Sequence, residues 1–352
     1  MAVTPIRSRR SVALGLFAAA LFSGCSDTNG PQPVIPVTRT ITVNAASAFT
    51  FVALDTIATN PAVADAATST DWDIGLYATT VMLNGGEAGP GGVTGHCLCQ
   101  YASLSNTEIA ALTAASTLGT FDSVTTADIP AATAFTSDAL APAIAGWVDN
   151  PGTGATPASG RSWIIREGTS SVVLAKFHVT NIQNPTATSA GTVTVEYAVQ
   201  PSAGAAFGSV QTAQIAMGAG PVYVDLTTGA VTTAANWDLR FDGYTIRVNG
   251  GVSGTGSVKA VLDTSTPFAS IDATYAASTP AVAYSADRYT GVFGTSPWYR
   301  YNITGTDNQI WPVYNVYLVQ RGTQVFKVQL VGYYGTDGTP RQITVRYAKL
   351  AN

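Results

Sequence analysis

The sequence of 352 residues has little charge and almost no histidine. Charged residues make up 11% of the chain, the formal net charge is −4, and there are two histidines and three methionines. Lysine and arginine form no cluster beyond residue 10, which argues against nucleic acid as a partner because phosphate backbones are bound by concentrated positive charge. Three cysteines are too few for a disulfide framework, so a hydrophobic core must stabilise the fold.

Signatures of common enzyme classes are also missing from the sequence. It contains no Gly-x-Ser-x-Gly, no phosphate-binding loop and no His-Glu-x-x-His. A serine triad would need His96 or His178 as its base, and no residue near either histidine stands out as a nucleophile. We therefore expect a protein that is not an enzyme.

Long apolar runs are absent except at the start of the chain. Three arginines within residues 7–10 precede an uncharged, mostly apolar segment over residues 11–22, and Ser23-Gly24-Cys25 follows. The apolar segment has the length of a signal-peptide core and is too short to span a bilayer. Since lipoprotein signal peptidase requires small residues before a cysteine, residues 1–25 are predicted to be a lipoprotein signal peptide with an acylated Cys25. An ordinary secretory signal with a chance cysteine is the alternative.

The residues after Cys25 indicate where the mature protein resides. Acyl chains on Cys25 would anchor it, because burying lipid CH₂ groups in a bilayer is favourable. Ser26, rather than an aspartate, follows the cysteine, which favours the outer membrane or cell surface. Residues 26–40 are rich in proline and are predicted to be an extended tether that holds the rest of the chain off the membrane.

The remaining chain contains a tandem duplication. Trp72 and Trp237 each begin a Trp-Asp strand that leads to an Asn-Gly-Gly turn, and each copy closes with a strand pair and a strand ending in Tyr197 or Tyr347. The tryptophans are 165 positions apart and the tyrosines 150, so the first copy carries about 15 extra residues between its landmarks. Such a period is too long for a solenoid unit.

The strand assignments rest on alternation of apolar and polar residues. Within 325–330 and 343–347 every second residue is apolar, as in a strand with one buried face. One short helix is predicted at 107–112, capped by Ser105 or Asn106. We predict an all-β fold of two tandem antiparallel β domains, 41–200 and 205–352. One domain built from two intertwined halves is the alternative.

The second copy resembles the HmuY-like haem-binding lipoproteins. The resemblance covers most of 220–352 and is carried by six segments: Trp237-Asp238-Leu239-Arg240-Phe241, 244–251 ending in Asn249-Gly250-Gly251, Ser253-Gly254-Thr255-Gly256, Trp298-Tyr299-Arg300-Tyr301, the hairpin 317–334 and the terminal Thr344-Val345-Arg346-Tyr347. The first copy matches through Trp72-Asp73-Ile74 and Asn84-Gly85-Gly86. The resemblance implies an all-β surface lipoprotein that binds haem and delivers it to an outer-membrane receptor for iron acquisition.

Two functions are therefore compatible with the sequence. The first is a non-catalytic carrier of haem or a related porphyrin. The alternative is a surface adhesion or interaction module that binds protein or glycan and keeps the fold without the haem ligands. The supply of iron ligands separates the two, because haem iron is held by His, Met, Cys or Tyr.

Few residues can serve as haem ligands. His96 and His178 lie in the first copy, and the second copy has no histidine. Met82 and Met217 are further candidates, as are the tyrosines of the second copy, Tyr299, Tyr301, Tyr333 and Tyr334. A histidine at a strand end, like His178, also occurs as an ordinary structural or surface residue. The aromatic residues of the second copy could line a groove for a flat or sugar-like ligand, or simply pack in the core.

Another candidate is the cluster His96-Cys97-Leu98-Cys99. Three metal-binding side chains fall within four residues and could hold a metal or haem. The spacing does not match a structural zinc site, and the order does not match the Cys-x-x-Cys-His motif of covalently attached haem. Outside the cytoplasm Cys97 and Cys99 could instead form a disulfide with each other, or remain buried thiols.

Overall fold

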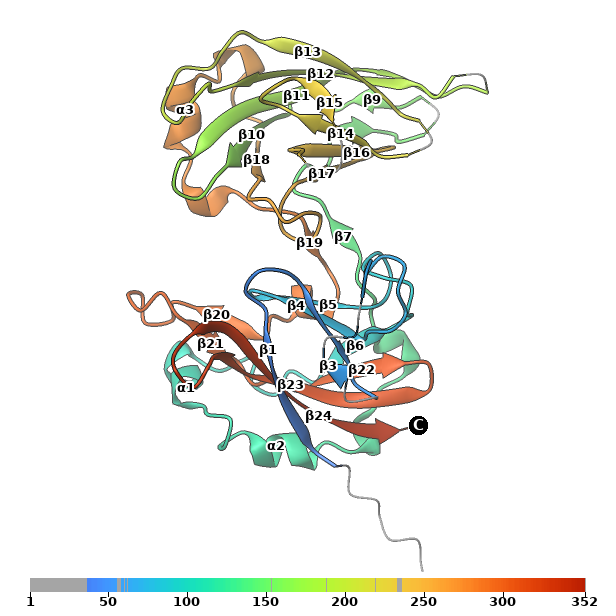
Figure 1. Ribbon diagram of the computed structural model, residues 1–352, viewed down its shortest axis with the longest axis vertical. Helices are drawn as coiled ribbons and strands as arrows, with labels where there is room; N and C mark the ends of the chain where they lie inside the picture. Colours follow the sequence, from blue (N-terminus) through green and yellow to red (C-terminus); the bar gives the residue numbers. More distant parts are fainter. Residues whose placement is uncertain are drawn as a thin grey trace, which may run out of the picture. The chain divides into compact units, whose positions relative to one another are not determined.

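The computed structural model describes residues 37–351, apart from 56–57, 60, 62, 153, 188, 219 and 233–235. The predicted signal peptide, Cys25 and most of the tether lie outside this part of the chain. No helix in the described part has the length and apolarity needed to cross a membrane. Antiparallel strands dominate the fold and the helices are short (Figure 1), which confirms the predicted all-β class.

One pair of sheets, here called the terminal module, contains the first and the last strand. Its five-stranded sheet has the order β1-β24-β23-β22-β6 and its four-stranded sheet the order β3-β2-β4-β5. The strands are β1 Arg39–Asn44, β2 Thr50–Ala53, β3 Ala58–Thr59, β4 Ile74–Tyr77, β5 Thr80–Leu83, β6 Thr94–Cys97, β20 Tyr299–Tyr301, β21 Ile310–Pro312, β22 Tyr317–Arg321, β23 Gln324–Tyr334 and β24 Pro340–Ala351. The helical segments are α1 Asn106–Ala111, α2 Leu118–Ser123, η1 Thr126–Asp128, η2 Ala132–Ala134 and α4 Val292–Thr295.

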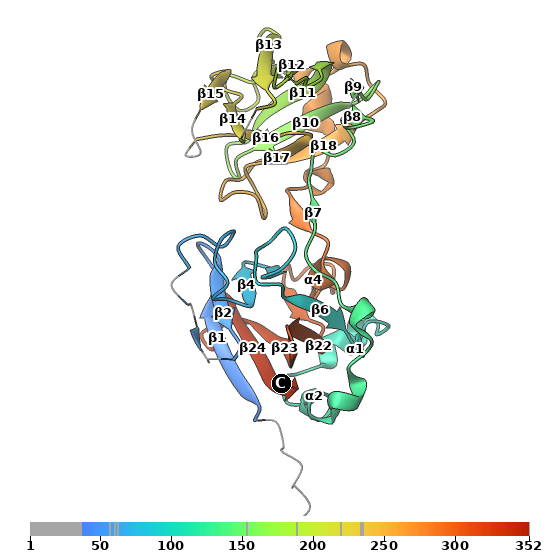
Figure 2. The same ribbon diagram turned by 90° about the vertical axis from the view of Figure 1, so that its right-hand side faces the viewer.

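A second pair of sheets, the central module, has the same plan (Figure 2). Its sheets have the orders β13-β12-β11-β10-β18 and β15-β14-β16-β17. The strands are β8 Val148–Asp149, β9 Thr156–Pro157, β10 Ser162–Glu167, β11 Val173–Gln183, β12 Thr192–Val199, β13 Gln211–Ala216, β14 Val222–Asp225, β15 Ala230–Thr232, β16 Leu239–Asp242, β17 Thr245–Val248 and β18 Lys259–Asp263. The helical segments are η3 Phe268–Ser270, α3 Ala273–Ser278 and η4 Ala281–Ala283.

Neither repeat copy closes its own five-stranded sheet. β1 of the first copy pairs with β24 of the second, with Thr42 opposite Thr344, and β6 pairs with β22. Reciprocally, β18 of the second copy pairs with β10 of the first. The core of the terminal module draws on residues within 43–93 and 292–347, and that of the central module on residues within 144–260. The copies 41–200 and 205–352 thus exchange halves, as in the intertwined alternative, but they form two cores instead of one.

The chain passes between the modules at two equivalent points. There β7 (Leu140–Ala141) and β19 (Arg288–Tyr289) form a two-stranded antiparallel ladder. A buried aspartate precedes each strand: Asp138 accepts a hydrogen bond from the Leu83 amide at 2.8 Å, and Asp287 accepts one from the Val248 amide at 3.1 Å. Each carboxylate therefore ties a crossing segment to a four-stranded sheet.

The two tryptophans predicted to be equivalent do occupy matching places. Trp72 is fully buried and Trp237 is 9% exposed. The side-chain amide of Asn84 donates to the Trp72 carbonyl at 2.8 Å, and that of Asn249 donates to the Trp237 carbonyl at the same distance. The Asn-Gly-Gly turns thus fasten the Trp-Asp strands in both copies, which confirms the predicted duplication.

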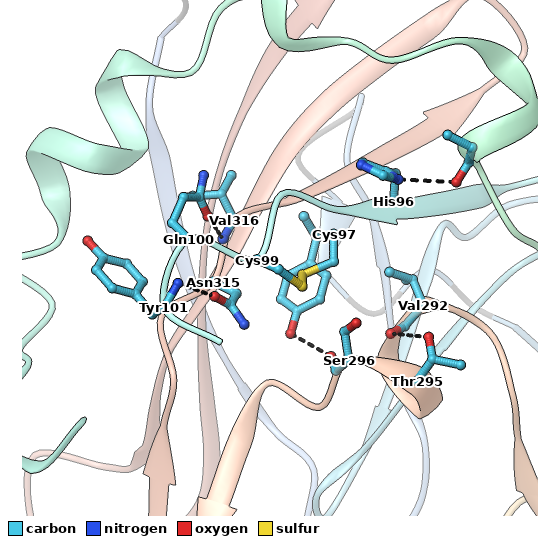
Figure 3. Close-up of a disulfide and its surroundings, with 12 residues drawn as sticks. His96, Cys97, Cys99, Gln100, Tyr101, Val292, Thr295, Ser296, Asn315 and Val316 are labelled. Atoms are coloured by element: carbon cyan, nitrogen blue, oxygen red, sulfur yellow. Dashed lines mark hydrogen bonds between the residues drawn. A yellow bond between two sulfur atoms is a disulfide. The ribbon is translucent and has the colours of Figure 1, made fainter. Parts of the chain in front are cut away.

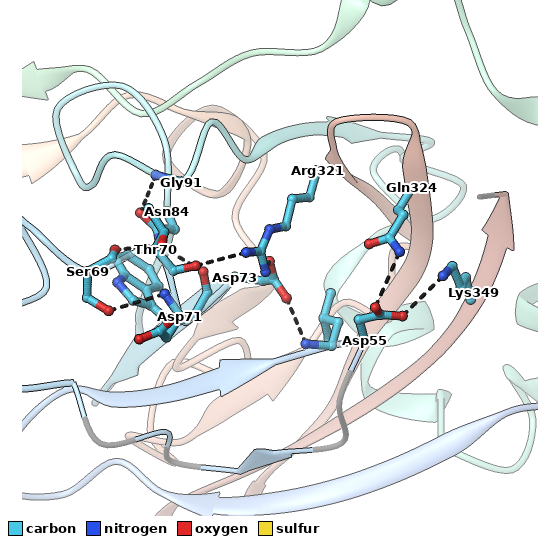
Figure 4. A network of polar contacts seen from close by, with 12 residues as sticks. Asp55, Ser69, Thr70, Asp71, Asp73, Asn84, Gly91, Arg321, Gln324 and Lys349 are labelled. Carbon is cyan, nitrogen blue, oxygen red and sulfur yellow. Dashed lines mark hydrogen bonds and ion pairs between the residues drawn. The ribbon is translucent and has the colours of Figure 1, made fainter.

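The aspartate after Trp72 joins the two copies within the terminal module. Asp73 accepts from the Leu54 amide at 2.7 Å and pairs with Arg321 of the second copy at 3.2 Å, as Figure 4 shows. Nearby, Asp55 pairs with Lys349 at 3.1 Å. Burial raises the pKa of Asp73, while the Arg321 guanidinium opposes that rise. These contacts give the exchanged halves a specific register.

Candidate functional site

A cavity of about 570 Å³ opens in the central module and contains one of the two histidines. This volume lies within the range typical of small-molecule sites. Its lining comes from β9 and the turn after it, from β11 and from the loop that follows β18. The lining residues are Pro157, Ala158, Ser159, Gly160, Arg161, Ser162, His178, Val179, Thr180, Thr264, Ser265, Thr266, Pro267 and Phe268.

His178 is held in the cavity by two neighbours. Its Nε2–H donates to the Glu196 carboxylate on the adjacent strand at 3.1 Å, and its ring stacks on Phe268 with centroids 3.8 Å apart. No hydrogen bond is recorded for Nδ1 within the described part of the chain. A carboxylate on one imidazole nitrogen fixes the tautomer and makes the other nitrogen a better metal ligand. The geometry therefore suits His178 to coordinate a metal through Nδ1.

Lys176 also contacts Phe268. Its Nζ donates to the Phe268 carbonyl at 2.9 Å and lies 4.5 Å from the centroid of the Phe268 ring. Burial lowers the pKa of Lys176, and nearby Asp272 opposes that change. Phe268 thus contacts both an ammonium group and an imidazole, and these contacts position the loop that borders the cavity.

The same place in the terminal module is covered by the protein itself. The strand registers align His178 with Gln329 and Glu196 with Arg346, rather than His178 with Val331 as the sequence alone indicated. Arg346 donates to Gln329 at 2.9 Å and to the Ala114 carbonyl at 2.6 Å.

The extra residues of the first copy provide this cover. Cys97 and Thr136 are 39 positions apart in the chain, whereas the matching residues Leu262 and Ser285 are 23 positions apart. Within the longer segment, the Tyr101 amide donates to Asn315 at 2.9 Å and the Ala114 carbonyl accepts from Arg346 at 2.6 Å. The extra residues cover this position in the terminal module. The equivalent position in the central module has no such cover and remains open as the cavity.

His96, Cys97 and Cys99 do not form the metal site that their spacing in the sequence allowed. Cys97 and Cys99 form a disulfide (Figure 3), so neither sulfur is a thiolate that could bind a metal together with His96. His96 donates from Nδ1 to the Ala134 carbonyl at 3.1 Å. No group of three or more His, Cys, Asp or Glu side chains in the described residues is arranged to hold a metal ion.

The other candidate ligands do not join His178 in the cavity. Met82 is 4% exposed and packs beside Trp72 in the terminal module. Met217 packs against the core of the central module and is not among the residues that line the cavity. His96 belongs to β6, in the other five-stranded sheet. The structure therefore does not bring the four predicted haem ligands together at one site.

The tyrosines of the second copy take structural roles in the terminal module. Tyr333 packs in its core with Trp298, and Tyr334 accepts a hydrogen bond from the Ile310 amide at 3.1 Å. Tyr299 stacks edge-on against Trp298, whereas Tyr301 is 58% exposed and donates to Asn308. Core packing and hairpin anchoring account for this aromatic cluster.

Sequence reasoning missed Phe268 and Arg161 as parts of the site. Neither lies in a motif; Arg161 reaches the cavity through the pairing of β10 with β11, and Phe268 through the pairing of β10 with β18 of the second copy. The available signal was the length difference between the copies, which marks the segment that covers one module and is short in the other.

Buried carboxylates elsewhere serve the fold. Burial raises the pKa of Asp138 to about 7 and that of Asp238 to about 6, against the hydrogen bonds donated by the Leu83 and Leu226 amides. Both residues bind backbone amides at strand ends. Neither lines the cavity that contains His178.

Comparison with known protein families identifies both copies. The family model described as HmuY protein matches residues 47–201 and 219–347, which together make up most of the chain. A search of curated proteins finds no match. The two matched ranges coincide with the two repeat copies and their Trp-Asp and Asn-Gly-Gly motifs. The chain is a tandem member of the HmuY family.

Proposed function

We propose that this protein is a cell-surface carrier that binds haem, or a related metalloporphyrin, in the cavity of the central module. The observation that carries the proposal is His178, which lines a cavity of about 570 Å³ with Glu196 on Nε2 and Nδ1 without a recorded partner. Membership of the HmuY family supports the same ligand.

The residues present fit a haem held by one protein ligand. Nδ1 of His178 would coordinate the iron, and Glu196 would orient the imidazole. Phe268 and Pro267 offer apolar surface to the macrocycle, and the threonine and serine side chains around them offer hydrogen bonds. No second strong iron ligand lines the cavity within the described residues. Bound haem would supply redox-active iron.

The proposed location follows from the N-terminal sequence. An acylated Cys25 would anchor the chain in the outer membrane, and the proline-rich residues 26–40 would let the modules reach an outer-membrane receptor. A carrier of this kind performs no catalysis.

Titration of haem into the purified mature protein tests the proposal. We expect a shifted Soret band in the wild type and its loss in His178→Ala. His96→Ala is the matched control, because His96 lies in the other five-stranded sheet, and it should bind as the wild type does. Equal binding by wild type and His178→Ala would refute the assigned ligand. No spectral change in the wild type would refute haem binding and leave the adhesion or interaction module as the function.

A further inference from the structure

One of the side chains that line the cavity in the central module is an arginine without a carboxylate partner. Arg161 is the only lysine or arginine in the lining, and it forms no ion pair among the described residues. A half-buried guanidinium without a partner has lost part of its hydration without compensation, so it favours an incoming anion.

The nearest carboxylate on the paired strand is already engaged. Asp263 pairs with Ser162, which is the residue that follows Arg161 in the chain. Its Oδ1 accepts from the amides of Ser265 at 2.7 Å and Thr266 at 3.0 Å; burial raises the pKa of Asp263, but hydrogen bonds from the Tyr275 side chain and from these amides lower it overall. Asp263 therefore shapes the loop and leaves Arg161 unpaired.

The terminal module shows what the position of Arg161 contacts when the site is covered. The strand registers align Arg161 with Asn315, whose Oδ1 accepts from the Tyr101 amide of the covering segment at 2.9 Å (Figure 3). A side chain at this position thus contacts the segment that covers the site. In the central module the same position carries a positive charge instead of a neutral amide.

Gly146 leaves room for the guanidinium. Its φ is +69°, and a Cβ built there would lie 2.5 Å from Nη1 of Arg161. Any larger residue would displace the charged group. Gly146 therefore leaves space for the guanidinium in its observed position.

From these contacts we infer that Arg161 binds a carboxylate of the ligand, so that the site selects planar porphyrins that carry free acid groups. The inference rests on the proposed function, because it assigns the acidic edge of the ligand to Arg161 and the metal to His178. An arginine fork matches a carboxylate in geometry and can form two parallel hydrogen bonds with it.

Iron-free protoporphyrin IX and its dimethyl ester separate the roles of Arg161 and His178. With the mature protein, fluorescence titration should show the free acid binding about tenfold more tightly than the ester. Arg161→Gln should lose that preference, whereas Arg161→Lys should keep part of it. Arg166→Gln is the matched control, because Arg166 lies on β10, the strand that Arg161 precedes, but lines another cavity.

Each result bears on a separate claim. Haem bound to Arg161→Gln should retain the wild-type Soret position, since His178 is intact. Equal affinities of wild type and Arg161→Gln for the free acid would overturn the inference and leave the proposed function standing. Equal weakening for acid and ester would also overturn it, because it would indicate a general loss of the site. If the wild type bound no porphyrin at all, the proposed function would fail, and the inference with it.

Discussion

His178 and Gln329 occupy the same position in the two five-stranded sheets, yet they face different surroundings. Gln329 is fully buried, donates from Nε2 to the Tyr314 carbonyl at 2.6 Å and accepts from Arg346. His178 faces a cavity and shares its hydrogen bond with Glu196. One duplicated position has thus become a core contact in one module and a candidate binding residue in the other.

The exchange of halves can be tested by disulfide crosslinking. Thr42 and Thr344 lie directly opposite each other, with their hydroxyl oxygens 2.9 Å apart. The double variant Thr42→Cys/Thr344→Cys should form an intramolecular disulfide, detectable by proteolysis and mass spectrometry. The control Thr42→Cys/Thr194→Cys should not, because Thr194 pairs with Gln214 in the central module. Crosslinking of the control instead would show that each copy closes its own sheet.

Phe121 and Phe268 should differ in their importance for stability. Phe121 is fully buried, so Phe121→Ala should cost about 3–5 kcal/mol in the free energy of unfolding, measured with denaturant. Phe268 is half-buried beside a cavity, and Phe268→Ala should cost about 1 kcal/mol while weakening haem binding by freeing the His178 ring. If both changes had equal effects on stability and none on haem binding, Phe268 would not position the ligand.

Asp138 should make stability depend on pH. Burial raises its pKa from 3.8 to about 7, so between these values the folded protein holds a proton that the unfolded chain releases. The contribution to stability is therefore fully present below pH 4 and is lost as the pH rises towards 7, by up to about 1.4 kcal/mol per pH unit. Asp138→Asn can still accept from the Leu83 amide, and it should flatten this part of a stability profile measured from pH 4 to 8. An unchanged slope in the variant would contradict this assignment.

The membrane anchor remains a prediction from the sequence. Cys25→Ala should abolish acylation and release the protein from the membrane fraction into the soluble fraction, as seen by fractionation and immunoblotting. Metabolic labelling with a fatty acid gives the direct readout of acylation. Membrane retention of the variant at the wild-type level would contradict the lipoprotein assignment.

The fold class and the duplication were predictable from sequence because they depend on local patterns. Alternation identified the strands, and the Trp-Asp and Asn-Gly-Gly motifs identified equivalent turns such as those of Asn84 and Asn249. The short helix α1 begins as its sequence indicated, with Ser105 as the cap of a capping box with Glu108.

The exchange and the site were less accessible because they depend on pairing between distant strands. From the sequence alone, the first strand of each copy could pair with the closing strand of its own copy or with that of the other copy, since the two copies carry the same pattern. Alignment by motif alone placed Val331 opposite His178, and a register error of two residues hid the match with Gln329. The disulfide between Cys97 and Cys99 was one of the alternatives that the sequence left open, and spacing alone could not select it.

The central claim is that one module binds haem and the other is filled by its own chain. Native mass spectrometry of the mature protein with excess haem tests it most directly. The account predicts one haem per chain in the wild type, one in His96→Ala and none in His178→Ala. Two haems per wild-type chain, or one haem retained by His178→Ala, would contradict it.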